Sequence, residues 1–320
     1  MKTRAPRNRT LTLTDEERTR LSGKLLRAPQ EWTAKALTDR VIQADLFEVL
    51  DLLPEHFVDL LILDPPYNLD KQFADQKFGR RTHADYLQYL ESWFPRLLKT
   101  LKPHATVYLC GDWQCSIADY QVMDKYLQVQ NRIIWQREKG RGAKNNWKNC
   151  CEDIWFGTVD QKYCFNVDAV KQKRRVIAPY RENGRPKDWE ETAEGNYRLT
   201  CPSNFWDDIS VPYWSMPENT DHPTQKPEKL LAKLILASSR LGDFVFDPFL
   251  GSGTTAVVAK KLGRHFAGIE INQEYCCWAL KRLERAETAP TIQGYADGVF
   301  WERNTLKKPQ RKHFNNNTTN

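Results

Sequence analysis

The sequence lacks the patterns that mark membrane, secreted and zinc-binding proteins. No segment approaches the roughly 20 apolar residues that span a bilayer, and no apolar run follows the basic start MKTRAPRNRT, so we expect neither a membrane helix nor a secretory signal. The eight cysteines form no CxxC pair and show no Cys/His spacing typical of zinc. We therefore expect free thiols, no metal site, no membrane partner and a cytoplasmic location.

Two nucleotide-binding motifs are also missing. The chain contains neither GxGxxG nor GxxxxGK[ST], which argues against a dinucleotide-binding protein and against an NTPase. What it does have is a positive net charge of +7 over 320 residues, which favours a polyanionic partner. Basic residues concentrate in the first 27 positions and again between 168 and 187, although a solvated loop is the plainer interpretation of such a run.

Short apolar segments alternate with helical patterns through most of the chain. Strands expected at 40–44 and 58–63 flank a helix at 46–53, and further strand and helix patterns follow, including a helix interrupted near Pro95. This alternation predicts an α/β fold with a doubly wound, mostly parallel sheet. The alternation stops over 167–221, which we interpret as an irregular insertion, and resumes afterwards. We divide the chain into a basic N-terminal arm (1–39), two α/β halves (40–166 and 222–286), the insertion between them, and a polar tail (287–320).

The passage VFDPFLGSGTTAVVAKKLGRHFAGIEIN predicts a ligand site. A strand ends at Asp247, the glycines Gly251 and Gly253 make a turn, and a helix begins near Thr254. Such loops let the backbone approach a ligand at the carboxyl ends of the strands. The next strand ends in Glu270, where a carboxylate can accept both ribose hydroxyls. The alternative is a tight turn without a ligand.

The stretch LILDPPYN raises the same choice, between a strand-end turn and a carboxylate held rigidly in a cleft. Together with HPTQKP at 222–227 and the glycine loop, it resembles the motifs of the β class of amino-group DNA methyltransferases, which have this permuted order. The resemblance covers about residues 41–283. It implies a circularly permuted, seven-stranded Rossmann-like sheet, S-adenosylmethionine as cofactor, double-stranded DNA as partner, and a DNA-recognition role for the insertion.

The resemblance also assigns site residues. The catalytic loop is Asp64, Pro65, Pro66 and Tyr67. Lys226 falls near the methionine end of the cofactor, and Asp45 near its adenine amine, although Asp45 is equally suited to cap the following helix. The cofactor pocket further includes Asp247, Phe249, Gly251, Gly253 and Thr254, with Glu270 on the ribose.

The chemistry of an exocyclic amine explains the catalytic loop. Its lone pair is delocalised into the base, and two rigid acceptors on its hydrogens would localise that pair toward a methyl donor. The Asp64 carboxylate and the Pro65 carbonyl supply two acceptors, and Tyr67 can stack on a flipped base. No covalent intermediate is needed. C5-cytosine enzymes use a Pro-Cys pair, which this chain lacks, since Cys201-Pro202 has the reverse order.

Two basic segments are candidates for DNA contacts. The first is the loop 138–149, and the second is the start of the insertion. The candidate residues are Arg141, Lys144, Lys148, Lys171, Lys173, Arg174, Arg175, Arg181 and Arg185.

We therefore predict a sequence-specific DNA methyltransferase acting on adenine N6, since Asp in the first position of the tetrapeptide is more usual for adenine enzymes in the family. The alternatives are cytosine N4, methylation of RNA or a protein amide, and a non-catalytic DNA-binding module. A restriction-modification role is expected, whereas a partner endonuclease and a homodimer are left open.

Overall fold

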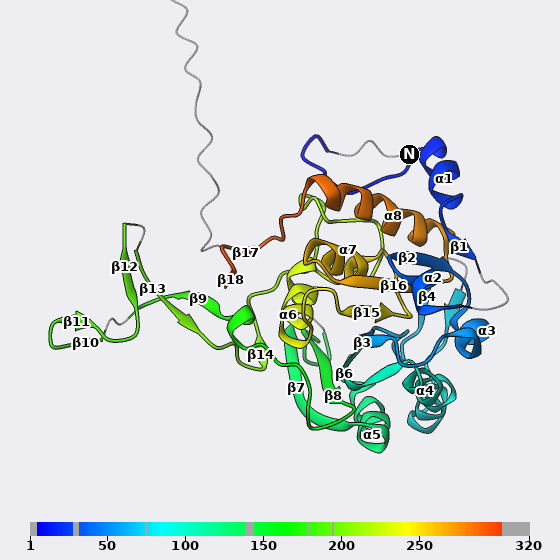
Figure 1. Ribbon diagram of the computed structural model, residues 1–320, viewed down its shortest axis with the longest axis horizontal. Coiled ribbons are helices and arrows are strands. Elements are labelled where there is room, and N and C mark those ends of the chain that lie inside the picture. Colours follow the sequence, from blue (N-terminus) through cyan, green and yellow to red (C-terminus); the bar gives the residue numbers. More distant parts are fainter. Residues whose placement is uncertain are drawn as a thin grey trace, which may run out of the picture.

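The centre of the molecule is a β-sheet. A computed structural model describes the chain over residues 5–27, 32–73, 76–137, 144–177, 180–193 and 195–302. The nine strands of this sheet follow the order β1-β2-β16-β15-β3-β6-β8-β7-β14 (Figure 1). Every neighbouring pair is parallel except the two that involve β8. The predicted α/β fold is confirmed, and two-residue edge strands extend the expected seven. The strands are β1 (Leu26–Arg27), β2 (Arg40–Gln43), β16 (His265–Glu270), β15 (Phe244–Asp247), β3 (Val58–Leu63), β6 (Leu101–Gly111), β8 (Cys151–Thr158), β7 (Gln128–Gln136) and β14 (Phe205–Trp206).

Helices cover both faces of this sheet. In β3, Leu60 and Ile62 pack with residues of α6, α7 and α8, whereas Leu61 and Leu63 pack with residues of α3, α4 and α5. This alternation is the two-residue period of a strand buried on both sides. The helices are α1 (Asp15–Ser22), α2 (Ala34–Leu37), α3 (Leu46–Val49), α4 (His83–Leu98), α5 (Ser116–Tyr126), α6 (Glu228–Ser238), α7 (Thr254–Lys261) and α8 (Gln273–Thr288), with 3-10 turns at Leu50–Leu52 and Asp168–Val170. None of the helices in the described ranges combines the length and apolarity needed to cross a membrane.

The helix predicted to break near Pro95 is continuous, so that prediction is wrong. Leu90, Trp93, Phe94 and Leu97 of α4 are fully buried. Each such side chain contributes roughly 1.5–3 kcal/mol on burial, which together exceeds the cost of about 3 kcal/mol for an interior proline. Packing therefore outweighs the lost backbone hydrogen bond.

The insertion contains short strands between residues 172 and 200, so the prediction of an irregular segment over 167–221 is wrong for that part; residues 201–221 form no helix or strand apart from β14. The short strands form an antiparallel arm that projects from the body of the molecule (Figure 1). The tail completes this arm: β18 pairs in parallel with β9, and Phe300 is fully buried. The tail is thus structural over its described part. The strands are β9 (Gln172–Arg175), β12 (Glu190–Thr192), β13 (Gly195–Thr200), β17 (Tyr295–Ala296) and β18 (Val299–Trp301), with β10 (Arg181–Glu182) and β11 (Arg185–Pro186) as a separate hairpin; β4 (Lys71–Phe73) and β5 (Gln76–Phe78) form another hairpin after β3.

The N-terminal arm folds back on α8. Thr14 and Glu17 form the capping box that their spacing predicts, and this box starts α1. Leu11 and Leu21 pack against Trp278 in a small apolar cluster. The described part of the arm is therefore a packed element of the fold.

Candidate active site

The catalytic and cofactor motifs meet at the carboxyl ends of two adjacent strands. β3 and β15 pair in parallel, with Leu60 opposite Val245, so Asp64 and Asp247 end neighbouring strands. A cavity of about 610 Å³ opens there, the place where doubly wound sheets bind ligands. The predicted residues that line it are Asp45, Asp64, Pro65, Pro66, Tyr67, Lys226, Asp247, Phe249, Gly251, Thr254 and Glu270.

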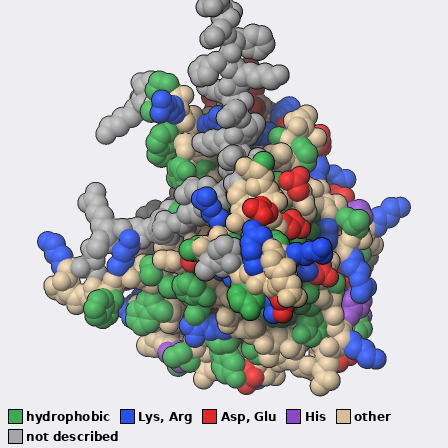
Figure 2. All heavy atoms as spheres, turned by 90° about the vertical axis from the view of Figure 1, so that its left-hand side faces the viewer, with side chains coloured by type: hydrophobic (Ala, Val, Ile, Leu, Met, Phe, Trp, Pro, Cys, Tyr) green, Lys and Arg blue, Asp and Glu red, His purple; other side chains and the backbone are tan. Residues whose placement is uncertain are grey.

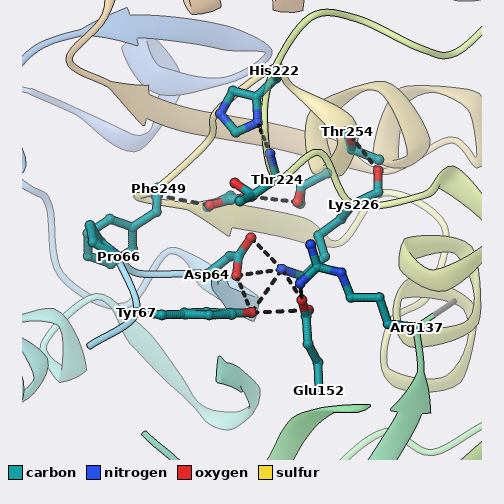
Figure 3. A network of polar contacts seen from close by, with 12 residues as sticks. Asp64, Pro66, Tyr67, Arg137, Glu152, His222, Thr224, Lys226, Phe249 and Thr254 are labelled. Carbon is teal, nitrogen blue, oxygen red and sulfur yellow. Dashed lines mark hydrogen bonds and ion pairs between the residues drawn. The ribbon is translucent and has the colours of Figure 1, made fainter. Parts of the chain in front are cut away.

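Lys226 makes an ion pair with the catalytic carboxylate. Its Nζ lies 2.7 Å from both Oδ1 and Oδ2 of Asp64 and donates to the Tyr67 hydroxyl at 3.0 Å (Figure 3). The Tyr67 hydroxyl in turn donates to Asp64 Oδ1 at 3.0 Å. Burial disfavours the ammonium, yet Asp64 and Glu152 raise the pKa of Lys226 above its ordinary value. Lys226 was predicted at the methionine end of the cofactor; the structure places its ammonium on Asp64.

Glu152 is a site residue that the sequence analysis missed. It lies in β8 with 3% of its surface exposed. Its Oε2 lies 3.2 Å from the Tyr67 hydroxyl, as the alternative acceptor for that single proton, and 3.3 Å from Lys226 Nζ. Its Oε1 pairs with the guanidinium of Arg137. Burial pushes the pKa of Glu152 upward, but Lys226 and Arg137 hold it below the ordinary value. The available signal was an acidic residue inside the strand segment EDIWFGT.

The catalytic loop is anchored from behind. Asn68 donates its backbone N–H to the Cys115 sulfur at 3.2 Å, and its side chain exchanges hydrogen bonds with the Arg81 backbone at 2.7 and 3.0 Å. The Tyr86 hydroxyl lies 3.4 Å from the Pro66 carbonyl oxygen. Together with the two fixed proline φ angles, these contacts hold Asp64 and the Pro65 carbonyl in place.

Two carboxylates shape the glycine loop, the buried Asp247 and the half-buried Glu270. Asp247 accepts from the Phe249 N–H at 3.0 Å and the Thr255 hydroxyl at 2.5 Å. Glu270 accepts from the backbone N–H groups of Gly251 at 2.9 Å and Asn272 at 2.8 Å. Burial raises the pKa of each carboxyl to about 7. Because a carboxylate offers about four acceptor positions, Glu270 keeps capacity for ligand hydroxyls.

The two glycines of the loop have different roles. Gly251 has φ +55°, and a Cβ there would lie 3.1 Å from the ring of His222. Gly253, predicted to shape the cofactor pocket, instead packs against α8, since a Cβ there would lie 2.4 Å from the Ala279 Cβ. It does not line the cavity. His222, a second missed residue, does line it, and burial lowers the pKa of its imidazole to about 3, which keeps the ring neutral.

The cavity fits a nucleoside-type cofactor. Phe47, Phe249 and Ile271 supply an apolar wall, and Glu270 stands at a strand end beside them. Asp45 caps α3 by accepting from the Phe47 N–H at 2.9 Å and also lines the cavity, so capping does not remove it from a ligand. Thr254 donates its hydroxyl to the Lys226 carbonyl at 3.0 Å. It thereby joins the glycine loop to the lysine segment.

The predicted DNA contacts are only partly described. Arg141 lies outside the described residues, whereas Lys144 and Lys148 are exposed between β7 and β8. Lys173 lies over the rings of Tyr197 and Trp301. Figure 2 shows Lys and Arg dispersed among hydrophobic side chains on the face toward which the arm projects.

Three of the six predicted DNA-contacting cations in the projecting arm of the insertion already have acidic neighbours. Lys171 pairs with Asp168 at 2.8 Å and Arg181 with Glu191 at 3.2 Å, and Arg174 lies 3.4 Å from Glu302. Exposed ion pairs of this kind contribute about 0–1 kcal/mol to stability, so DNA phosphates could take the place of the acidic partners. Within the described part of the chain, Arg175 and Arg185 are exposed and make no ion pair.

Comparison with known proteins identifies the family. A family model described as DNA methylase, of the N6/N4 methyltransferases, matches residues 58–281. The chain is 35% identical over 254 residues to the DNA adenine methyltransferase YhdJ of Escherichia coli, covering 77% of this chain and 83% of the relative. It is 33% identical over 251 residues to the type II methyltransferase M.HpaI of Haemophilus parainfluenzae, covering 78% and 75%. The chain belongs to the N6/N4 DNA methylase family and is a DNA methyltransferase.

Solved structures agree on the fold. The cytosine-N4-specific PvuII DNA methyltransferase aligns with a TM-score of 0.56 and 17% identity over 78% of this chain and 90% of that one. TTHA0409 of Thermus thermophilus, complexed with S-adenosyl-L-methionine, aligns with a TM-score of 0.51 and 22% identity over 84% and 99%.

Proposed function

We propose that this DNA methyltransferase is sequence-specific and methylates the exocyclic N6 of adenine in double-stranded DNA after flipping the base out of the duplex. The observation that carries the proposal is that one cavity holds both Asp64, at the end of β3, and the glycine loop at the end of β15. The adenine methyltransferase YhdJ, at 35% identity, supports adenine as the target.

The methyl donor is S-adenosylmethionine, which supplies an electrophilic methyl group when bound. Glu270 and Asp45 would hold its ribose and adenine, and Phe249 and Gly251 would shape its pocket. Asp64 accepts a hydrogen bond from the target amine and the Pro65 carbonyl accepts a second, so that the nitrogen lone pair points at the methyl carbon. The carbon–nitrogen bond would form as the carbon–sulfur bond of the bound donor breaks, and Asp64 would receive the proton that the amine loses.

The side chain of Tyr67 lines the same cavity. A flipped adenine can stack on its ring, because such chemistry requires the base to leave the helix. The hydroxyl of Tyr67 is already held by Asp64 and Lys226, which fixes the ring as a stacking platform. Burial and Asp64 raise the pKa of Tyr67 well above its ordinary value, so the hydroxyl stays protonated.

Lys144 and Lys148 and the arm residues are proposed to bind DNA. Lysine and arginine neutralise phosphates, and Arg185 lies in the β10–β11 hairpin of the projecting arm. The insertion lies between the two α/β halves, a position that suits a DNA-recognition element. A methyltransferase of this kind would serve as the modification enzyme of a restriction-modification system.

Base-resolved analysis of oligonucleotides methylated by the purified enzyme tests the proposal. Methyl groups on adenine N6 are expected. Methyl on cytosine N4 alone would overturn the choice of base while leaving the chemistry intact. A tritium-transfer assay that labels RNA and leaves duplex DNA unlabelled would overturn the substrate.

A further inference from the structure

We infer that Glu152 is a positioning residue that draws competing hydrogen-bond donors away from Asp64. The inference rests on Asp64 being the acceptor for the target amine. Asp64 already accepts from Lys226 through both oxygens and from the Tyr67 hydroxyl. An incoming amine must find a free acceptor position on this carboxylate. Glu152 is the neighbouring group to which the same two donors can turn.

The distances support such an exchange. Lys226 Nζ lies 2.7 Å from Asp64 and 3.3 Å from Glu152 Oε2, and the Tyr67 hydroxyl lies 3.0 Å from Asp64 and 3.2 Å from Glu152. Both donors therefore stand between two carboxylates. A movement of roughly half an ångström brings either donor to a normal hydrogen-bond distance from Glu152, because such bonds span about 2.7–2.9 Å from an ammonium and about 2.5–2.7 Å from a hydroxyl.

The charges of the network balance. Asp64 and Glu152 are the two anions, and Lys226 and Arg137 are the two cations (Figure 3). A buried unpaired carboxylate costs several kcal/mol, and Arg137 from the end of β7 pairs with Glu152 through its other oxygen. Glu152 can thus stay ionised whether Lys226 sits on it or on Asp64.

Loss of the Glu152 charge has a definite consequence. Lys226 and the Tyr67 hydroxyl would then remain on Asp64, occupying the positions that the amine needs. Binding of cofactor and DNA would not depend on this exchange, since Glu152 lies in β8 and does not line the cavity. The effect should therefore appear in the rate of methyl transfer and not in affinity.

The test compares Glu152→Gln with Asp153→Asn. Asp153 is the next residue of β8 and is also buried. It pairs with Arg132 at a distance of 3.0 Å, and neither residue lines the cavity. Single-turnover transfer from tritiated S-adenosylmethionine is measured on the base that the wild type methylates, with cofactor affinity by calorimetry and thermal unfolding alongside. We expect Glu152→Gln to lower the rate roughly 10- to 100-fold, as for a misplaced reacting group, with cofactor affinity unchanged. Asp153→Asn should retain the wild-type rate.

A double variant separates this role from a merely structural one. In the Glu152→Gln background, Tyr67→Phe removes one of the donors left on Asp64, so the double variant should be faster than Glu152→Gln alone. If Glu152→Gln does not fold, Arg137→Met/Glu152→Gln removes the outer pair without leaving a lone charge, and the same loss of rate is expected. The inference would be overturned by a wild-type rate in folded Glu152→Gln or in folded Arg137→Met/Glu152→Gln. It would also be overturned if adding Tyr67→Phe to Glu152→Gln lowered the rate further. Since each comparison uses whichever base the wild type methylates, the result does not depend on the choice of adenine.

Discussion

Substitution of Gly253 by alanine should destabilise the protein through a collision between two helices. Gly253 is the N-cap residue of α7 and has φ +83°, and an added Cβ would lie 2.4 Å from the Cβ and 2.8 Å from the Cα of Ala279 in α8. Gly242 provides a matched control, because its φ is +80° and nothing lies within 4 Å of an added Cβ. Both variants carry the same backbone penalty, and only one carries the clash.

The expected magnitudes follow from these two terms. The left-handed conformation costs an L-residue about 1–2 kcal/mol, partly offset by about 0.4–1 kcal/mol from the less flexible unfolded chain. Gly242→Ala should therefore lose roughly 1 kcal/mol. Overpacking adds about 1–3 kcal/mol, so the expected loss for Gly253→Ala is roughly 2–4 kcal/mol.

Urea unfolding followed by circular dichroism measures both variants. A larger loss for Gly253→Ala, at unchanged m-value, is the expected result. Equal losses in the two variants would refute the reasoning, because they would mean that α8 moves aside at no cost and that Gly253 is kept for its φ angle alone.

Three further predictions concern the site and the arm. Asp64→Ala should retain cofactor and DNA binding but lose about 10²-fold or more in methyl transfer; near-wild-type turnover would contradict the mechanism. Since burial raises the pKa of Glu270 from 4.5 to about 7, the folded state loses stability as pH rises through this range. The unfolding free energy of Glu270→Gln minus that of the wild type should accordingly become more positive by roughly 1–3 kcal/mol between about pH 5 and pH 8. If this difference does not change with pH, Glu270 is not the group that causes the loss of stability. Phe300→Ala should cost about 3–5 kcal/mol where β18 packs and expose the arm to limited proteolysis, and an unchanged cleavage pattern would show that the tail does not support the arm.

The sequence revealed the parts of the site that are local. Asp64 and Asp247 come at the ends of apolar runs. The bounds of β3 were predicted to the residue because five of its six residues are apolar, and all six, including Asp59, are buried in the structure. The rule that parallel strands expose their carboxyl ends at one edge then placed the two carboxylates together.

Contacts between distant segments were not predictable in the same way. Lys226 and Asp64 are 162 residues apart, and no periodicity relates them. The arm was mistaken for irregular chain because its strands are only two to six residues long and one of its central pairings, β9 with β18, joins segments more than a hundred residues apart. Short strands exposed on both sides show little alternation of apolar and polar residues.

The order of strands in the sheet has a consequence for synthesis on the ribosome. β2 and β3 lie in the first 63 residues, but β16 and β15, which separate them, begin only at residues 265 and 244. Because synthesis proceeds at about 5–20 residues per second, the facing edges of β2 and β3 remain unpaired for roughly 10–40 s after they are made. β3, β6, β8 and β7 can assemble in the meantime, whereas β2 cannot join that unit until the cofactor half has emerged. The nascent chain therefore carries open strand edges, where neighbouring chains can pair, through most of its translation.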